Sequence, residues 1–251
     1  MIRVSSYGKT KKGAGRVTNG DAMILDPRLN LFAVADSVGV GAWRKSPAER
    51  VLTHMAKYVA AKMRGKAAHK GATLSHAIYS ANEHLLDLSE KSPGKIGSTT
   101  ITSCLIAGDH CCIAHAGDSV ALHVHEGRVR RITSEDTVAG VLRSRNMISE
   151  SKSMTHPNRN WLLRSLGNNK SLEINTYDVS IEPGDLIILM TDEIARTLGG
   201  KGIASLALAR TASEAWKKLP SDMMAAALRG GCQDDMTVIV LKVYATPCSQ
   251  R

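Results

Sequence analysis

The sequence lacks any long apolar run, and this absence excludes helices that cross a membrane. In a chain of 251 residues, the longest apolar stretches, such as Leu186–Met190, are far shorter than the roughly 20 residues that a spanning helix needs. The residues that follow Met1 are mixed polar and charged, without the apolar centre of a secretory signal peptide. We therefore expect a cytoplasmic protein with no membrane partner.

Aromatic residues and paired cysteines are also scarce. Aromatic residues make up 4% of the chain, with a single Phe, so the core has to be built from Ala, Val, Ile, Leu and Met. The five cysteines form no Cys-x-x-Cys pair, and Cys111 and Cys112 are neighbours in a predicted strand, where they point to opposite faces. This pattern argues against a disulfide framework or a zinc site and favours a reducing compartment.

Positive charge is abundant but dispersed. The chain has 33 Lys and Arg against 23 Asp and Glu, a formal net charge of +10. This excess is compatible with nucleic acid, an anionic surface or an anionic substrate. The basic residues form only short clusters, such as 9–12 and 128–131, and no aromatic residues alternate with them as a base-stacking surface requires. Nucleic acid is therefore not the expected partner, and we interpret the charge as solvated surface.

The apolar pattern predicts one domain, residues 1–251, because neither a linker nor an internal repeat interrupts it. Ser46, Pro47 and Glu49 form a capping-box pattern that opens a helix. Helices are expected over 46–63, 73–88, 203–218 and 222–229, and strands over 21–25, 30–35, 98–107, 111–116, 120–125, 129–132, 172–179, 186–190 and 237–243. Strands and helices are grouped rather than alternating, which predicts an α+β fold with antiparallel sheets.

Acidic residues stand at the ends of five predicted strands: Asp21, Asp36, Asp118, Asp192 and the pair Asp234 and Asp235. Aspartate also ends strands simply as a turn former or helix cap. If these carboxylates converge instead, their repulsion requires a compensating charge, and hard divalent cations prefer oxygen ligands. No His or Cys is placed to select zinc, so Mg²⁺ or Mn²⁺ is expected. Arg16, close before Asp21, has the forked group that binds an anionic substrate.

Several blocks, taken in order, resemble the metal-dependent protein serine/threonine phosphatases of type 2C (the PPM family), and bacterial single-domain members above all. The resemblance covers roughly residues 5–243. Its blocks are G-R-V-T-N-G-D-A at 15–22, L-F-A-V-A-D-S-V-G at 31–39, G-S-T-T at 97–100, A-H-A-G-D-S at 114–119, H-P-N-R-N at 156–160, L-R-S-L-G at 163–167, D-L-I-I-L-M-T-D at 185–192 and D-D-M-T-V-I-V at 234–240.

The resemblance implies an α–β–β–α sandwich, in which two antiparallel sheets are flanked by helix pairs and a two-metal centre of Mn²⁺ or Mg²⁺ lies at one end. It also implies that a water activated by both metals hydrolyses phosphoserine or phosphothreonine. The implied substrate is a phosphorylated protein, opposed by a Ser/Thr kinase, and the expected oligomeric state is a monomer. The metal residues by carry-over are Asp36 as the bridge, Ser37 through its backbone carbonyl, Asp192 and Asp234 for the first ion, Asp118 for a weaker third ion and Asp21 in the outer shell. Asp36 and Arg16 would be catalytic, with Arg16 holding the phosphate.

The sequence departs from the family pattern at five positions of the site. Gly20 stands where the family has an acidic ligand of the second metal, and Ser37 replaces a glycine. Glu193 also replaces a glycine, Val120 replaces an arginine, and Arg196 stands where many members carry a third-metal aspartate. The alternative hypothesis is therefore a degenerate, non-catalytic module with the phosphatase fold that binds phosphorylated partners.

Overall fold

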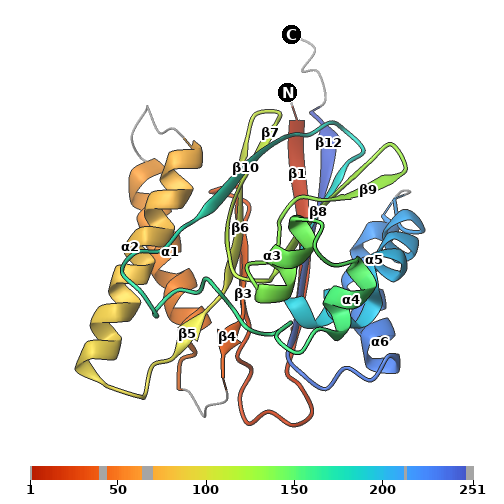
Figure 1. Cartoon of the computed structure of the whole chain (residues 1–251). Coiled ribbons are helices and arrows are strands. Elements are labelled where there is room, and N and C mark those ends of the chain that lie inside the picture. The colour runs from red at the N-terminus through yellow and green to blue at the C-terminus, as the bar shows by residue number, and fades with distance from the viewer. Residues whose placement is uncertain (1, 40–43, 64–69, 212–213, 247–251) are drawn as a thin grey trace.

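Two five-stranded antiparallel sheets face each other, and a helix pair covers the outer face of each (Figure 1). The computed structural model describes residues 2–39, 44–63, 70–211 and 214–246. One sheet has the order β1 (Ile2–Lys11), β12 (Met236–Ala245), β11 (Leu186–Met190), β8 (Val120–His125) and β9 (Arg128–Arg131). The other has the order β10 (Asn175–Ser180), β7 (His110–Ala116), β6 (Ile101–Ala107), β3 (Leu31–Ala35) and β2 (Ala22–Asp26). The predicted α–β–β–α arrangement is confirmed.

The remaining elements are the helices and one short strand pair. The long helices are α1 (Pro47–Met63) and α2 (Lys70–Lys91) beside the β2–β10 sheet, and α5 (Asp192–Leu208) and α6 (Leu219–Arg229) beside the other (Figure 1). The shorter elements are α3 (Val138–Ser144), α4 (Glu150–Thr155), the 3₁₀ helix η1 (Ala215–Lys218) and the pair β4 (Ser37–Val38) and β5 (Ser98–Thr99).

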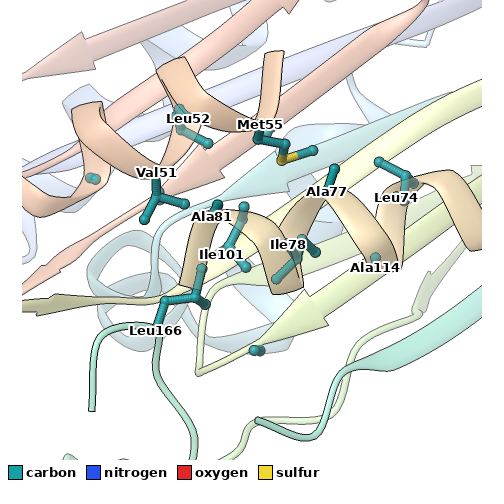
Figure 2. Packing of buried hydrophobic residues seen from close by; sticks show 14 of the residues in the cluster. Val51, Leu52, Met55, Leu74, Ala77, Ile78, Ala81, Ile101, Ala114 and Leu166 are labelled. Atoms are coloured by element: carbon teal, nitrogen blue, oxygen red, sulfur yellow. The ribbon is translucent and has the colours of Figure 1, made fainter. Parts of the chain in front are cut away.

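Alternating side chains divide the core into three layers. In β3, Leu31 packs under α1 and α2, whereas its neighbour Phe32 packs between the sheets. In β11, Ile187 faces the space between the sheets and Ile188 faces α5 and α6. The α1–α2 layer is filled by aliphatic side chains, as Figure 2 shows. Because the strands are buried on both faces, they read as nearly continuous apolar runs.

Local signals place the start of α1 as predicted. The Ser46 hydroxyl accepts a hydrogen bond from the Glu49 amide at 3.1 Å, and the Glu49 carboxylate accepts one from the Ser46 amide at 2.9 Å. This reciprocal capping box satisfies two amides that the helix itself leaves unpaired. The opposite facing of Cys111, between the sheets, and Cys112, toward the helices, is also confirmed.

One strand is missed by the sequence patterns, and two sequence predictions are wrong. Strand β1 was not expected, because most of its residues are polar and only Ile2 and Val4 pack between the sheets; it pairs with β12 along its whole length. A continuous helix over 203–218 is not formed: α5 begins at Asp192, bends at Gly199 (φ 62°) and ends at Leu208, and η1 follows later. Strand β10 begins at Asn175 rather than at 172.

No helix within the described ranges has both the length and the apolar character needed to cross a membrane.

Candidate metal centre

The antiparallel registers bring the five acidic strand ends to the same end of the sandwich. In the β2–β10 sheet, Ala22 pairs with Ala35 and Ile101 with Ala116, so the residues just beyond these positions lie together. In the other sheet, Met190 lies between Val120 and Val238. Asp118 stands in the connection from β7 to β8 and therefore joins the two ends. The acids gathered there are Asp21, Asp36, Asp118, Asp192 and Asp234.

Asp21 is the buried acid of the group, with 5% of its surface exposed. Its Oδ2 accepts hydrogen bonds from the hydroxyls of Thr191 (2.9 Å) and Thr237 (2.7 Å). Its Oδ1 is fully buried and receives no hydrogen bond. Burial, opposed by the two threonines, raises the pKa of Asp21 to about 7. An orphaned carboxylate oxygen at this depth indicates a place for a cation or its bound water.

Asp36 lies beside Asp21, and hydrogen bonds to its backbone hold it there. The Thr99 hydroxyl and the Thr100 amide donate to the Asp36 carbonyl at 2.8 and 2.9 Å, and the Asp36 amide donates to the Thr100 hydroxyl at 3.2 Å. Burial, reinforced by the negative charges of Asp21 and Asp192, raises the pKa of Asp36 well above its ordinary range. The Asp36 carboxylate is therefore held close to other carboxylates that repel it, as expected of a ligand shared by two cations.

Asp118 follows a glycine that no other residue can replace without strain. Gly117 has φ +122°, and a Cβ there would lie 2.5 Å from Cβ of Thr100. The close approach turns the chain from β7 into β8 and presents Asp118 to the centre. Burial, followed by the charge of Asp192, raises the pKa of Asp118 well above its ordinary range.

Asp192 is the first residue of α5 and binds an arginine on its own helix. Burial raises the pKa of Asp192, the positive charge of Arg196 opposes the rise, and the charge of Asp234 adds to it. Arg196 forms an ion pair with Asp192 through Nη2. The place beside Asp192 that the resemblance reserves for a third metal thus has a guanidinium next to it.

Asp234 is bound by Arg16 in a two-pronged ion pair. Nε and Nη2 of Arg16 lie 2.6 Å from Oδ1 and Oδ2 of Asp234, and Nη1 donates to the Gly39 carbonyl at 3.1 Å. Burial disfavours the ionised form of Asp234, but the hydrogen bonds from Arg16 and from the Asp235 amide outweigh it and lower its pKa. Arg16, expected to bind phosphate, thus lies at the rim of the acidic group.

Ser37 and Asp235 fix the loop that carries Gly20. Asp235 accepts hydrogen bonds from the amides of Gly13 and Gly20, both at 2.7 Å. The Ser37 hydroxyl donates to the Gly20 carbonyl at 2.6 Å and accepts from the Ala48 amide at 3.1 Å. Ser37 is absent from the positive-φ residues in the described part of the chain, so replacing the family glycine causes no backbone strain here.

The donor set fits hard divalent cations. In the described part of the chain, the ionisable side chains around the centre are carboxylates and arginines, together with the buried Cys232 thiol, which contacts the Asp234 backbone carbonyl at 3.8 Å. Asp36, Asp118, Asp192 and Asp234 remain partly exposed, so they can be reached from solvent. Two cations would offset the repulsion between carboxylates that raises the pKa of Asp36. At the place expected for a third metal ion, Arg196 already supplies a positive charge.

Sequence reasoning missed the hydroxyls that support the acids. Thr99 and Thr100 hold the backbone of Asp36, and Thr191 and Thr237 hold the carboxylate of Asp21. Each is a polar residue with no exposed surface, or almost none, next to or within an apolar strand. Only Thr191 stands next to one of the acids in the sequence, so the sequence offers a signal for Thr191 but none for Thr99, Thr100 or Thr237.

A second ionisable cluster lies at the opposite end of the sheet. His123 Nε2 and His125 Nδ1 are each 2.8 Å from an oxygen of Asp185, and the three ligand atoms lie within 4.8 Å of one another, a spacing that also suits a metal ion. Asp185 precedes β11, whereas Asp192 follows it, so this cluster is separate from the acidic centre. Asp185 also accepts from the Glu182 amide at 2.9 Å, so each of its oxygens already has a partner.

Facing antiparallel sheets between helix pairs, with acids gathered at one end, define the PPM serine/threonine phosphatase fold, and the predicted resemblance is confirmed. The chain belongs to the family described as Stage II sporulation protein E (SpoIIE), whose profile matches residues 30–244.

Mycobacterial phosphatases are among its relatives. "Serine/threonine protein phosphatase PstP" of Mycobacterium tuberculosis (strain CDC 1551 / Oshkosh) is 26% identical over 237 residues, which is 94% of this chain and 44% of PstP. The chain thus spans less than half the length of that relative. A crystal structure of the PstP catalytic domain in complex with two manganese ions superposes with a TM-score of 0.84 at 22% identity, covering 98% of this chain and 100% of that one. The crystal structure of the phosphatase MsPP of Mycobacterium smegmatis, in complex with cacodylate, superposes with a TM-score of 0.81 at 24% identity and covers 95% of this chain and 97% of that one.

Proposed function

We propose that this chain is a Mn²⁺- or Mg²⁺-dependent protein serine/threonine phosphatase. The observation that carries the proposal is the convergence of five aspartates from five strand ends, with an arginine at their rim. Carboxylates gathered this closely repel one another and cost folding stability, and function is the usual reason for retaining them. The names of the relatives support phosphorylated Ser/Thr proteins as substrates, and a cognate Ser/Thr kinase would supply them.

The residues would divide the work according to their positions. Asp36, whose pKa is raised by the neighbouring charges of Asp21, Asp192 and Asp118, would be the residue that holds both ions. Asp192 and Asp234 would complete the shell of the first ion, and the backbone carbonyl of Ser37 would serve the second. Asp21, the more deeply buried acid, would hold coordinated water rather than the ion itself.

Bound divalent cations supply an activated water nucleophile and neutralise the charge of the phosphate. The chain supplies the rest. Arg16 presents a planar fork that matches phosphate oxygens as well as it matches the Asp234 carboxylate. If Arg16 released Asp234 and bound the substrate instead, Asp234 would be free to act as a metal ligand and the guanidinium would lie beside the phosphate. Thr99 and Thr100 keep the Asp36 backbone in place.

Hydrolysis of p-nitrophenyl phosphate and of a phosphothreonine peptide, measured with and without Mn²⁺, tests the proposal. We expect turnover that requires the metal and stops on exhaustive treatment with EDTA. Asp36→Asn should abolish it by removing the shared ligand. Asp109→Asn, at an exposed aspartate in the β6–β7 turn, is the matched control and should keep wild-type turnover.

The alternative, a non-catalytic module that binds phosphoproteins, makes a different prediction for the same samples. Such a module would retain the phosphopeptide without releasing phosphate at any Mn²⁺ concentration. Binding without turnover in the wild-type chain would therefore reject the enzyme and support the binding module, whereas metal-independent turnover would reject the two-metal site.

A further inference from the structure

Arg196 is a second cation, besides Arg16, that the chain itself brings to the acidic centre. It lies one turn after Asp192 on α5, and its Nη2 contacts Oδ2 of Asp192 and lies 3.0 Å from Oε2 of Glu193. Only 28% of the Arg196 side chain and 18% of the Asp192 side chain are exposed. An ion pair shielded to this degree interacts more strongly than one on the open surface.

The electrostatic reach of Arg196 extends beyond Asp192. Burial opposes its charged form, but the charges of Asp192, Glu193, Asp118 and Asp36 outweigh burial and raise its pKa. In return, its positive charge counteracts the rise in the pKa of Asp118. The same charge also helps to lower the pKa of Asp234, but Asp192 is the predicted metal ligand that the guanidinium contacts directly.

Arg196 also binds a residue of the connection that follows α4. Its Nη1 donates to Oδ1 of Asn160 at 2.6 Å. Asn160 lies in the connection after α4. A turn forms around it, because the Trp161 amide donates to the Asn158 carbonyl at 3.1 Å. One guanidinium thus bridges an acid of the centre and residues 138–161, which contain α3, α4 and the start of the connection after them and are called the α3–α4 segment below.

We propose that Arg196 is a built-in replacement for a third metal ion: its guanidinium neutralises Asp192 and at the same time holds Asn160, and with it the α3–α4 segment, beside the centre. While Arg196 is bound to Asp192, its guanidinium occupies Oδ2 of that carboxylate and its positive charge opposes the binding of a third cation there. The chain would then operate with one cation fewer than a relative that carries an aspartate at this position. Arg196 is a positioning residue, because it acts through Asp192 and Asn160. The proposal deepens the proposed function and rests on it for its meaning in catalysis.

The number of Mn²⁺ ions bound per chain tests the proposal without any turnover. Isothermal titration calorimetry and equilibrium dialysis with Mn²⁺ alone would compare the wild type with Arg196→Met and Arg196→Asp. Methionine keeps an apolar stem of similar reach but removes the charge, and aspartate adds a carboxylate. We expect each variant to bind one Mn²⁺ more than the wild type, about tenfold more tightly in Arg196→Asp than in Arg196→Met, because the added carboxylate is a hard ligand.

Three further variants separate the metal effect from general damage. Arg143→Ala is the matched control: Arg143 lines the same cavity of about 400 Å³ beside the centre but faces Glu135, at 3.7 Å. It should keep the wild-type number of ions. Arg196→Lys should do so as well, because it retains the charge. Asn160→Ala should leave the number unchanged while making the α3–α4 segment more sensitive to limited proteolysis.

The overturning result is an unchanged number of ions in both Arg196→Met and Arg196→Asp, with circular dichroism and melting temperature showing folded protein. If Arg196→Asp does not fold, Arg196→Met alone decides. A chain that binds the extra ion in these variants but never hydrolyses phosphate would support this inference and reject the proposed function, so the two can fail separately.

Discussion

Arg16 and Asp234 are joined by two nitrogen–oxygen contacts of 2.6 Å each, although one is expected to bind phosphate and the other a metal ion. While Arg16 and Asp234 are bound to each other, Arg16 cannot bind phosphate with its fork and Asp234 cannot bind a metal ion with both oxygens. Metal and substrate would therefore open the pair together, with the cation taking the carboxylate and the phosphate taking the guanidinium.

Arg16→Ala should consequently separate metal binding from substrate binding. Removing the competing cation frees Asp234, so the Mn²⁺ concentration for half-saturation should fall by about threefold to tenfold, given that the pair is only partly buried. The KM for phosphopeptide should rise, because the phosphate loses its fork. Calorimetry and steady-state kinetics measure the two effects. Arg28→Ala, an arginine with 93% of its side chain exposed, is the control; weaker Mn²⁺ binding by Arg16→Ala would contradict the competition.

Thr237→Val tests whether hydroxyls hold Asp21 in place. The substitution keeps the shape of the side chain but removes the bond to Asp21 and the contact with the Thr10 hydroxyl at 2.8 Å. A buried carboxylate that loses a donor costs about 1–3 kcal/mol of unfolding free energy. Urea denaturation of the metal-free protein measures it, with the exposed Thr155→Val as the control. A loss no larger than that of the control would show that Asp21 is held by other contacts.

The parts of the fold that could be predicted depend on local patterns. The capping box at Ser46 and Glu49 and the apolar runs of β3 and β11 are encoded in adjacent residues, and they are found where expected. β1 escaped prediction because its stability comes from pairing with β12, more than 200 residues away, rather than from its own composition.

The acids of the site could be predicted, but their partners could not. An aspartate after an apolar strand is visible in the sequence, and the antiparallel register then brings such ends together. The pairing of Arg16 with Asp234 links residues 218 positions apart, so no spacing rule reveals it. Arg196 was visible as a departure from the family pattern, yet only the geometry shows that it binds Asp192 and Asn160.

The cluster at the far end of the sheet predicts a pH-dependent stability. The hydrogen bond to Asp185 raises the pKa of His125, while the Glu182 amide and the two histidines outweigh burial and lower the pKa of Asp185. Because the pKa of His125 is raised on folding, its contribution to stability is complete below about pH 6.5 and disappears as the pH rises through the folded pKa. Because the pKa of Asp185 is lowered on folding, its contribution is complete above about pH 4 and disappears as the pH falls through the folded pKa. The pair therefore stabilises most between these limits.

His125→Gln should accordingly lower the melting temperature most near pH 5 and progressively less toward pH 8. The nearby charges of Glu126 and Glu182 act in the same direction as Asp185 on His125. Differential scanning calorimetry across this range measures the profile, and the exposed His76→Gln is the control. A melting-temperature difference that stays constant from pH 5 to pH 8 would show that the pair does not titrate with folding.

Gly20 offers the sharpest test of the second metal position. The family carries an acid there, whereas in this chain the second ion would rest on Asp36, the Ser37 carbonyl and water. The backbone of Gly20 is held by Asp235 and Ser37, and Gly20 is absent from the positive-φ glycines in the described ranges, so its φ is one that a residue with a side chain can adopt. Gly20→Glu should therefore lower the Mn²⁺ concentration needed for half-maximal activity by restoring a charged ligand.

Gly20→Gln is the matched control, because it adds the same bulk without the charge and should leave the metal requirement near that of the wild type. Mn²⁺ should be preferred to Mg²⁺ by the wild-type chain, and the preference should narrow in Gly20→Glu, since Mg²⁺ demands more ideal geometry and gives up its waters less readily. Asp36→Asn should abolish activity in either background by removing the shared ligand. If Gly20→Glu melts at the wild-type temperature yet requires as much metal, Gly20 does not lie beside the second ion.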